Sequence, residues 1–301
     1  MDFRELQYII TIADCESITQ AAKKLYISQP SLSYALSTIE KNLGTKLFMR
    51  NQHPLQLTPA GEIYVSTARH ILHEKDMLHN KIADLTENNR SQLRFGIPTE
   101  RLGYMLPLVI NRFRHRFPNA DFQIKEAPSY ELLDLLTKDK ISFAILPYHP
   151  ENLPHEFTST LIYNETLPLI INPKLLKNTL PSTKLNLLDL QALPFIAIKK
   201  GHSIRDLVDQ LFVSYSITPN TLIEVDSIIT ATQLAACGLG YTIVTGRAED
   251  ILGDKASTYC FTYTDNPLFW PVQAVYKPNT YLNKAEQYLI TLMQETFSKV
   301  D

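Results

Sequence analysis

The sequence has few cysteines and no long apolar run. Its 301 residues include only Cys15, Cys237 and Cys260, which are too few and too scattered for a disulfide framework or a zinc site. No stretch approaches the roughly 18 consecutive apolar residues of a membrane span. The first residues also lack the basic region and the cleavage site of a signal peptide. These absences predict a soluble, cytoplasmic chain with no membrane partner.

The motifs of common enzyme classes are also missing. The chain contains no G-x-S-x-G elbow, phosphate-binding loop, dinucleotide fingerprint or metal-spaced histidine set. His70, His73 and His79 have no accompanying carboxylate triad, so solvated side chains are favoured over metal ligands. Gly238 and Gly240 predict a helix-to-strand turn rather than a cofactor loop. We therefore expect no enzyme, no metal site and no cofactor.

The composition is that of an ordinary globular protein. Hydrophobic residues make up 45% of the sequence, and the formal net charge is −2. A chain of this length is expected to form two or more domains with proper cores. Cys237 lies in an apolar run and is expected to be a buried thiol. A peroxide-sensing pair of C-terminal cysteines is the alternative, and it would require reactive thiols.

Residues 17–44 predict two short helices joined by a tight turn. Ser17 or Thr19 caps the first helix, Ser28 caps the second, and Pro30 falls in a first turn that needs no N–H at that position. Four apolar residues of the second helix are expected to face inward: Leu32, Leu36, Ile39 and Leu43. The outward row is polar, small and uncharged: Gln29, Ser31, Ser33, Tyr34, Ser37 and Thr38. Such a row suits a DNA major groove, although an ordinary helical hairpin of a bundle is the alternative.

A small hairpin is expected next, with strands over 46–50 and 55–58 and a turn over 51–54. This wing adds to a local basic patch in a nearly neutral chain. Between residues 17 and 60 the basic side chains are Lys23, Lys24, Lys41, Lys46 and Arg50, against Glu40 alone. A patch of this kind is expected to contact phosphates.

The order of helix pair, wing and long helix closely resembles the LysR-type transcriptional regulators. The likeness is carried by Ala21, Ala22, Leu25, 28–33, Ile39, Glu40, Leu43, Gly44, Leu47, Phe48, Arg50, Leu57, Thr58, Ala60 and Gly61. The resemblance implies that double-stranded DNA is the partner and that the second helix reads it. The residues expected at DNA are Ser28, Gln29, Pro30, Ser31, Ser33, Tyr34 and Thr38 of that helix, with Arg50 and Thr58 at the wing. Tyr34 departs from the family pattern, in which a basic residue is common, and it can stack on a sugar or pack a thymine methyl.

A packing helix is expected over 3–13 and a linker helix from Pro59 to about residue 88, followed by a polar hinge over 87–91. The linker shows a heptad seam with one polar core position: Tyr64, Ala68, Ile71, Lys75, Leu78, Ile82 and Leu85. A helix this long is marginal alone in water, so a partner helix is favoured over packing on its own chain. We expect a homodimer through this seam, and the resemblance adds a homotetramer as the alternative.

From residue 92 onward, short strands alternate with helices, which implies parallel, doubly wound sheets. The expected domains are 1–58 (winged helix-turn-helix), 59–91 (linker helix and hinge) and 92–301 (α/β effector domain). Two crossings of the chain divide the last domain into lobe I, about 92–165 and 266–301, and lobe II, about 166–265. Two lobes with a cleft and a hinge resemble the effector domain of the same family and, more distantly, periplasmic binding proteins.

Ligands of doubly wound sheets sit beyond the carboxyl ends of the strands. Thr99, Ser129 and Ser203 stand just before predicted helices, where backbone N–H groups and the positive end of the helix dipole favour an anion. Lys199, Lys200 and His202 add positive charge, and Glu100 opposes it. The expected effector site comprises Thr99, Ser129, Tyr148, His202 and Ser203. In the equally open alternative, these side chains only cap their own helices.

These observations favour a DNA-binding transcriptional regulator controlled by a small-molecule effector, with a carboxylate as the expected effector class. Two alternatives stay open. One is a cleft-type solute-binding protein, which the N-terminal ninety or so residues and the missing signal peptide oppose. The other is a redox-sensing regulator without a diffusible effector.

Overall fold

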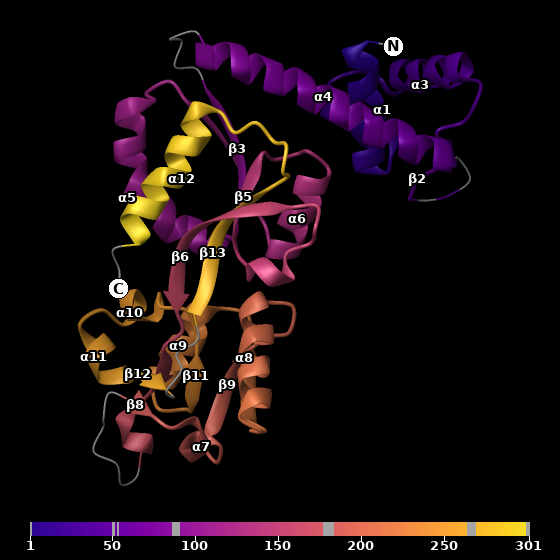
Figure 1. Ribbon diagram of the computed structural model, residues 1–301. Coiled ribbons are helices and arrows are strands. Elements are labelled where there is room, and N and C mark those ends of the chain that lie inside the picture. The colour runs from indigo at the N-terminus through magenta and orange to yellow at the C-terminus, as the bar shows by residue number, and fades with distance from the viewer. Residues whose placement is uncertain are drawn as a thin grey trace.

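The computed structural model describes residues 2–49, 52, 54–85, 91–176, 184–263 and 269–298 (Figure 1). A small N-terminal module comes first, with α1 (Phe3–Cys15), α2 (Ile18–Lys24), α3 (Gln29–Leu43) and the antiparallel strands β1 (Phe48–Met49) and β2 (Gln56–Leu57). Side chains cap all three helix starts, since Asp2, Ser17 and Ser28 each accept a backbone N–H. The predicted winged helix-turn-helix is therefore confirmed.

The core of this module joins all three helices. Its fully buried members include Ile9, Ile12, Ala21, Leu32 and Leu36. The predicted inward position of Leu43 is wrong, because this side chain is 46% exposed. It occupies the last position of α3, next to Gly44, whose φ of 71° turns the chain out of the helix.

The linker helix is α4 (Pro59–Leu85), and it reaches from the N-terminal module across to lobe I (Figure 1). Its first half belongs to the module, since Ala68 is buried with Leu6 and Ile10 of α1, and Tyr64 and Ile71 pack beside them. The hinge expected over 87–91 lies outside the described residues except for Ser91.

Lobe I contains a five-stranded sheet covered by helices on both faces. Its elements are β3 (Gln92–Ile97), α5 (Thr99–Arg116), β4 (Asp121–Glu126), α6 (Ser129–Thr137), β5 (Phe143–Pro147), β6 (Thr158–Thr166), β13 (Phe269–Tyr276) and α12 (Lys284–Phe297). Successive side chains of β5 point to opposite faces of the sheet and contribute to the core on each face. Phe143 and Ile145 pack under α5 and α12, whereas Ala144 and Leu146 pack under α6.

Lobe II has a six-stranded sheet in the order β10-β9-β11-β7-β12-β8. Its strands are β7 (Leu169–Ile171), β8 (Lys184–Leu185), β9 (Pro194–Ile198), β10 (Asn220–Val225), β11 (Tyr241–Ile243) and β12 (Cys260–Tyr263). Its helices are α7 (Leu187–Leu190), α8 (Ser203–Ser214), α9 (Ile228–Ala236), α10 (Ala248–Leu252) and α11 (Ala256–Tyr259). The core of this lobe consists of strand side chains that pack against α8 and α9.

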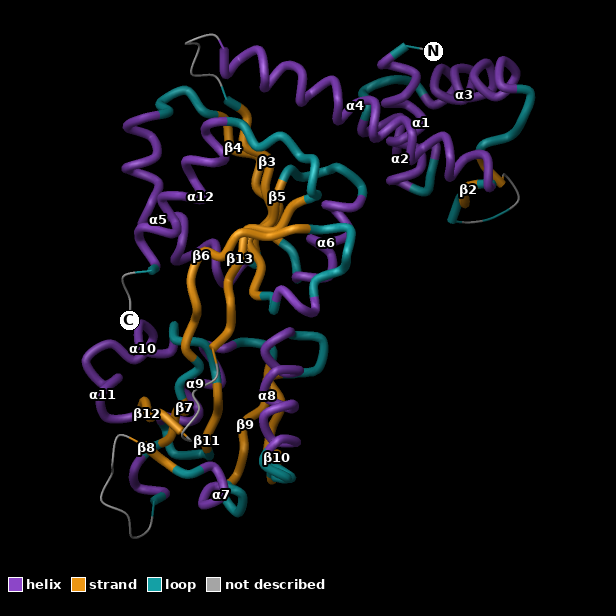
Figure 2. Tube along the Cα trace, viewed as in Figure 1, coloured by secondary structure: helices purple, strands orange, loops and turns teal. Residues whose placement is uncertain are grey.

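The α/β architecture of two lobes is confirmed, but the sheets are mixed rather than wholly parallel. In lobe I the order is β4-β3-β5-β13-β6, where β3 runs parallel to β4 and β5, and β13 is antiparallel to β5 and β6. Strands β6 and β13 run side by side toward lobe II and carry the two crossings (Figure 2). Strand β6 was not expected from the sequence, because its many polar residues do not alternate with apolar ones as in a half-buried strand. Only Ile162 and Glu165 of this strand are buried.

Candidate functional site

The outward face of α3 carries the side chains expected at DNA. Gln29 and Pro30 are exposed at its first turn, and Tyr34 is 77% exposed one turn later. Ser28 and Ser31 are also exposed, but their hydroxyl oxygens lie 2.7 Å apart within the helix cap. The cap therefore engages these two hydroxyls, and Gln29 and Tyr34 are the larger side chains directed to solvent.

Two further residues define this face. The hydroxyl of Thr38 donates to the Tyr34 carbonyl at 3.0 Å, so the helix itself uses this donor, while Ser33 is half-buried. Tyr26, in the turn between α2 and α3, is 95% exposed with a φ of 55°. An aromatic ring at this turn adds an apolar, stackable surface beside the helix.

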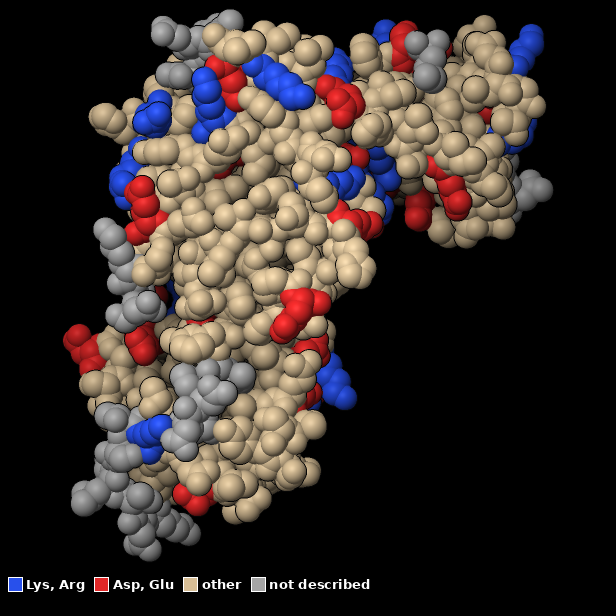
Figure 3. Space-filling model, in the orientation of Figure 1, with Lys and Arg blue, Asp and Glu red and all other residues tan. Residues whose placement is uncertain are grey.

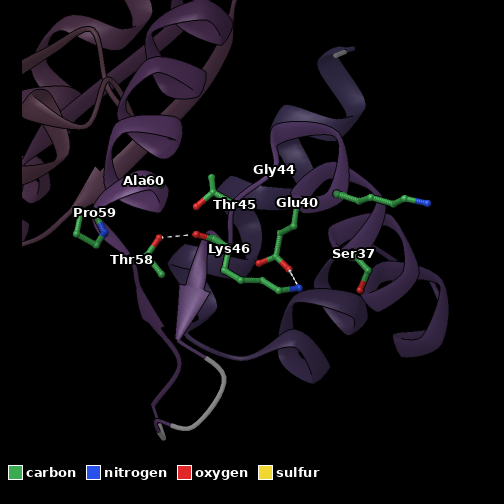
Figure 4. A pocket seen from close by; sticks show the side chains of 9 residues that line it. Ser37, Glu40, Gly44, Thr45, Lys46, Thr58, Pro59 and Ala60 are labelled. Carbon is green, nitrogen blue, oxygen red and sulfur yellow. Dashed lines mark hydrogen bonds and ion pairs between the residues drawn. The ribbon is translucent and has the colours of Figure 1, made fainter.

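The wing is fixed to α3 by a buried carboxylate. Glu40 accepts the Leu47 backbone N–H at 2.9 Å and pairs with Lys46 at 2.9 Å, and its side chain is 1% exposed (Figure 4). In the sequence, Glu40 is the one acid of the basic patch and one of the residues that carry the family likeness. In the structure its carboxylate holds the chain at Leu47, next to the first wing strand.

Thr58 ties the second wing strand to α4. Its hydroxyl donates to the Lys46 carbonyl at 2.7 Å and accepts the Gly61 N–H at 3.0 Å (Figure 4). Gly61 cannot carry a side chain, because an added Cβ would lie 2.0 Å from the Leu47 carbonyl oxygen. The structure thus gives Thr58 a capping role, and Arg50, the other wing residue expected at DNA, lies outside the described residues.

An open depression of about 890 Å³ lies between the end of α3, the wing and the start of α4. Its lining includes Ser37, Lys41, Gly44 and Thr45 beside the Glu40–Lys46 pair. Exposed lysines and hydroxyls at its rim are suited to phosphate oxygens, which need positive charge and hydrogen-bond donors.

The expected effector residues gather at three helix starts. Thr99, Ser129 and Ser203 are the first residues of α5, α6 and α8, and His202 is the N-cap of α8. Among the described residues, no side chain caps α5, α6, α8 or α9, whereas side chains cap α1, α2, α3 and α12. The alternative reading of these residues as caps is therefore contradicted, and the backbone N–H groups at these starts are not engaged by cap side chains.

Charges around the expected effector residues are more balanced than the sequence indicated. Lys199 pairs with Asp226 at 2.6 Å, and His202 lies 3.9 Å from the same carboxylate. Burial raises the pKa of Glu100, while the nearby His202, Arg101 and Arg247 act to lower it. Because His202 and Arg247 belong to lobe II, these effects place Glu100 close to both lobes. Tyr148, after β5, is half-buried and its backbone N–H donates to the Pro271 carbonyl at 2.9 Å.

A buried polar cluster that was not expected from the sequence lies where the lobes join. Arg101 pairs with Glu165 at 2.6 Å and donates to the hydroxyls of Tyr104 and Tyr163 at 2.9 and 3.2 Å. Burial acts to lower the pKa of Arg101, but Glu165 and the two tyrosines raise it, so the guanidinium stays charged. From lobe II, Arg247 lies over the Tyr104 ring at 4.6 Å. Its Nη1 is buried without a hydrogen-bond partner in the described part of the chain.

The heptad seam of α4 is divided. Ala68 is 1% exposed and packs within its own chain, so it is not available to a partner, which corrects its expected role. Tyr64 and Ile71 are partly buried in the same contact. By contrast, Leu78, Ile82 and Leu85 are 55%, 50% and 86% exposed. Dimerisation through these last three residues stays a prediction.

The thiols differ from expectation. Cys237 is exposed, so its expected burial is wrong, because it follows the last turn of α9 where Gly238 turns the chain with a φ of 89°. Burial and the nearby Glu249 raise the pKa of Cys260 to about 11, which disfavours a reactive thiolate. In the described ranges, no cluster of three or more acids, histidines and cysteines could hold a metal ion, and no helix is long and apolar enough to cross a bilayer.

Known proteins are similar to this chain in both sequence and fold. A family model described as the LysR substrate binding domain matches residues 86–298, and one described as a bacterial regulatory helix-turn-helix protein of the lysR family matches residues 3–62. The transcriptional regulator YybE of Bacillus subtilis is 29% identical over 81% of this chain and 82% of its own. A probable cat1 operon transcriptional activator of Acinetobacter lwoffii is 25% identical over 84% of each chain.

Solved structures agree in fold. A full-length OxyR variant from Pseudomonas aeruginosa, with one cysteine replaced by aspartate, matches 98% of this chain and 94% of its own, with a TM-score of 0.72 and 20% identity. CbnR in complex with its target DNA matches 98% and 99% of the two chains, with a TM-score of 0.64 and 21% identity. With matching models over nearly its whole length, the chain belongs to the LysR family of DNA-binding transcriptional regulators, with an N-terminal helix-turn-helix and a C-terminal effector-binding domain.

Proposed function

We propose that a small anion of the carboxylate class binds between lobes I and II and controls how this regulator occupies its operator. The regulator would act in the cytoplasm on double-stranded DNA, as a homodimer or homotetramer, through α3 and the wing. The effector would be held by Thr99 and Ser129 from lobe I and by His202 and Ser203 from lobe II, with Tyr148 beside them.

One observation carries this proposal. The helices α5, α6, α8 and α9, two from each lobe, follow parallel strands and begin without a side-chain cap in the described structure. Helix starts expose backbone N–H groups and the positive end of the helix dipole, and both favour negative charge. An anion bound there would supply the acceptors that cap side chains supply elsewhere in this chain.

Glu100 sets a condition on the ligand. A charged carboxylate beside the site would repel an anion, and desolvation raises the pKa of Glu100 from its ordinary value. Anion binding would raise this pKa further, so the proposal predicts tighter binding as the pH falls. A redox mechanism has less support, because the one half-buried C-terminal thiol, Cys260, has its pKa raised.

The test is a thermal-shift screen of the full-length protein against carboxylates, inorganic phosphate and sulfate, with amines and neutral sugars for comparison. A ligand of the folded state raises the melting temperature by mass action. The proposal predicts a shift with at least one carboxylate that Thr99→Val abolishes, while Thr291→Val, on the exposed face of α12, keeps it. Shifts from amines or neutral compounds alone, or an unchanged response in Thr99→Val, would contradict it.

A further inference from the structure

Helix α4 has two faces of different chemistry. One carries the exposed apolar residues Leu78, Ile82 and Leu85. The opposite face, called the docking face here, lies against lobe I and the end of α1, and it comprises Arg69, His73, Asp76, Met77 and Asp84. Spacings of three, four and seven residues place these five side chains on one side of the helix.

An ion cluster joins the N-terminal module to lobe I. Asp14, at the end of α1, accepts from Arg69 at 2.6 Å and from Lys140 at 2.8 Å. Lys140 lies in the loop between α6 and β5 of lobe I. The three side chains are only 18%, 16% and 33% exposed, so the cluster is partly shielded from water.

Two more carboxylates continue the contact along α4. Asp76 pairs with Arg94 of β3 at 2.9 Å. Asp84 accepts the Tyr281 hydroxyl at 2.7 Å and the Lys284 backbone N–H at 3.0 Å, at the start of α12. In Figure 3, side chains of both charge signs gather where the N-terminal module meets lobe I.

His73 lies at the middle of the docking face. It is 9% exposed, and its Nδ1 has no hydrogen-bond partner within the described residues. Burial lowers its pKa; Arg94 and Lys277 add to this effect, while Asp139 and Glu74 oppose it. Lys277 and Asp139 are themselves paired at 2.6 Å. The contact thus buries an imidazole between charged pairs.

The docking face and the interlobe cleft lie at opposite ends of the same strands. Strand β3 carries Arg94 near its start and leads to Thr99. Strand β5 follows Lys140 and leads to Tyr148, and β13 begins where the lobes join and ends just before Lys277. The surface that holds α4 and the ends of the strands toward lobe II are thus joined by the same packed strands.

We propose that the docking face is a reversible latch, which holds the N-terminal module against lobe I of its own chain and whose release lets that module reorient. The contact is made mainly by ion pairs and one buried imidazole. Ion pairs near solvent are individually weak and are screened by salt, so this contact opens more readily than an apolar core. The latch is defined without an effector, and its test does not depend on one.

The test is hydrogen exchange of the full-length protein, with sedimentation on the same samples. Lys140→Glu places two carboxylates together at Asp14, and the latch predicts that exchange at residues 69–77 of α4 rises by about threefold or more. Asp14→Asn should raise exchange in the same segment, whereas Lys140→Arg should keep the wild-type rate. The matched control is Lys138→Glu, because Lys138 pairs only with Asp134 of its own helix among the described residues.

The results separate the latch from other contacts. Wild-type exchange in both Lys140→Glu and Asp14→Asn would overturn the proposal, as would an equal rise in Lys138→Glu. If Lys140→Glu instead changed the sedimenting mass, the contact would lie between chains, and the intrachain latch would be wrong. Local exchange that rises at constant mass, and rises also when salt is added to wild type, would support it.

Discussion

Gln29 is the best-placed reader of base edges among the exposed side chains of α3, because its amide can both donate and accept. We predict that Gln29→Ala relaxes sequence preference by about 1–3 kcal/mol, the usual loss for one bidentate base contact. Competition gel shifts with promoter and scrambled DNA measure this preference. Equal discrimination by the variant and wild type would remove Gln29 from the reading surface.

Arg50 provides the contrast, since it is expected at a phosphate, and a phosphate contact carries no sequence information. Arg50→Ala should weaken binding to all sequences alike and flatten its dependence on salt. The same gel shifts at several salt concentrations give the slope. Wild-type affinity for both specific and random DNA in this variant would show that the wing assignment is wrong.

Glu286 gives a prediction for stability against pH. It is fully buried in the cap of α12, and burial raises its pKa from 4.5 to about 7. Folding therefore favours the neutral carboxyl, a stabilisation that is complete below about 4.5 and is lost as the pH rises through about 7. We predict that Glu286→Gln makes the urea midpoint less dependent on pH across this window. The same slope in the variant and wild type would contradict the burial argument.

Single-residue roles were only partly predictable. The caps by Ser17 and Ser28 follow from local sequence, because a cap and its helix are neighbours along the chain. The Arg101–Glu165 pair was missed, because its partners are 64 residues apart and no local pattern joins them. Thr58 was assigned to DNA by resemblance, whereas its hydroxyl in the structure caps α4.

Helix α4 carries the predicted dimer seam. We predict that Leu78→Asp dissociates the homodimer, because a carboxylate buried in an apolar seam is costly unless it is paired. Sedimentation measures the mass, and affinity for a two-site promoter should fall with it. Ile63→Asp is the matched control, because Ile63 is 70% exposed on the same helix but off the seam. An unchanged oligomer in Leu78→Asp would remove the seam argument.

The heptad period indicated the correct helix but not the partner of each residue. Period reports which side chains share a face, and both α1 and a second chain can cover such a face. Ala68 is covered by α1, and Leu85 is left open. Strand β6 was missed for a related reason: one of its faces is largely exposed, so its sequence lacks the apolar run of a buried strand.

For the whole molecule, the order of domains followed from the resemblance, and the alternation of helices and strands identified both lobes. The sequence could not give the contact between the N-terminal module and lobe I. That contact joins Asp14 to Lys140 and Asp84 to Lys284, pairs that are far apart along the chain. The cleft residues were predicted from strand ends and helix starts, and the structure adds that these helix starts lack cap side chains among the described residues.

The most direct test of the central claim joins the cleft to DNA. The carboxylate with the largest thermal shift is added to gel shifts on the promoter next to the protein's own gene, with wild type and Thr99→Val. We predict that the carboxylate changes the affinity or the protected length of DNA for wild type only, and that the two proteins bind DNA alike in its absence. An equal response in both proteins, or none in wild type, would contradict control by an anion in the cleft.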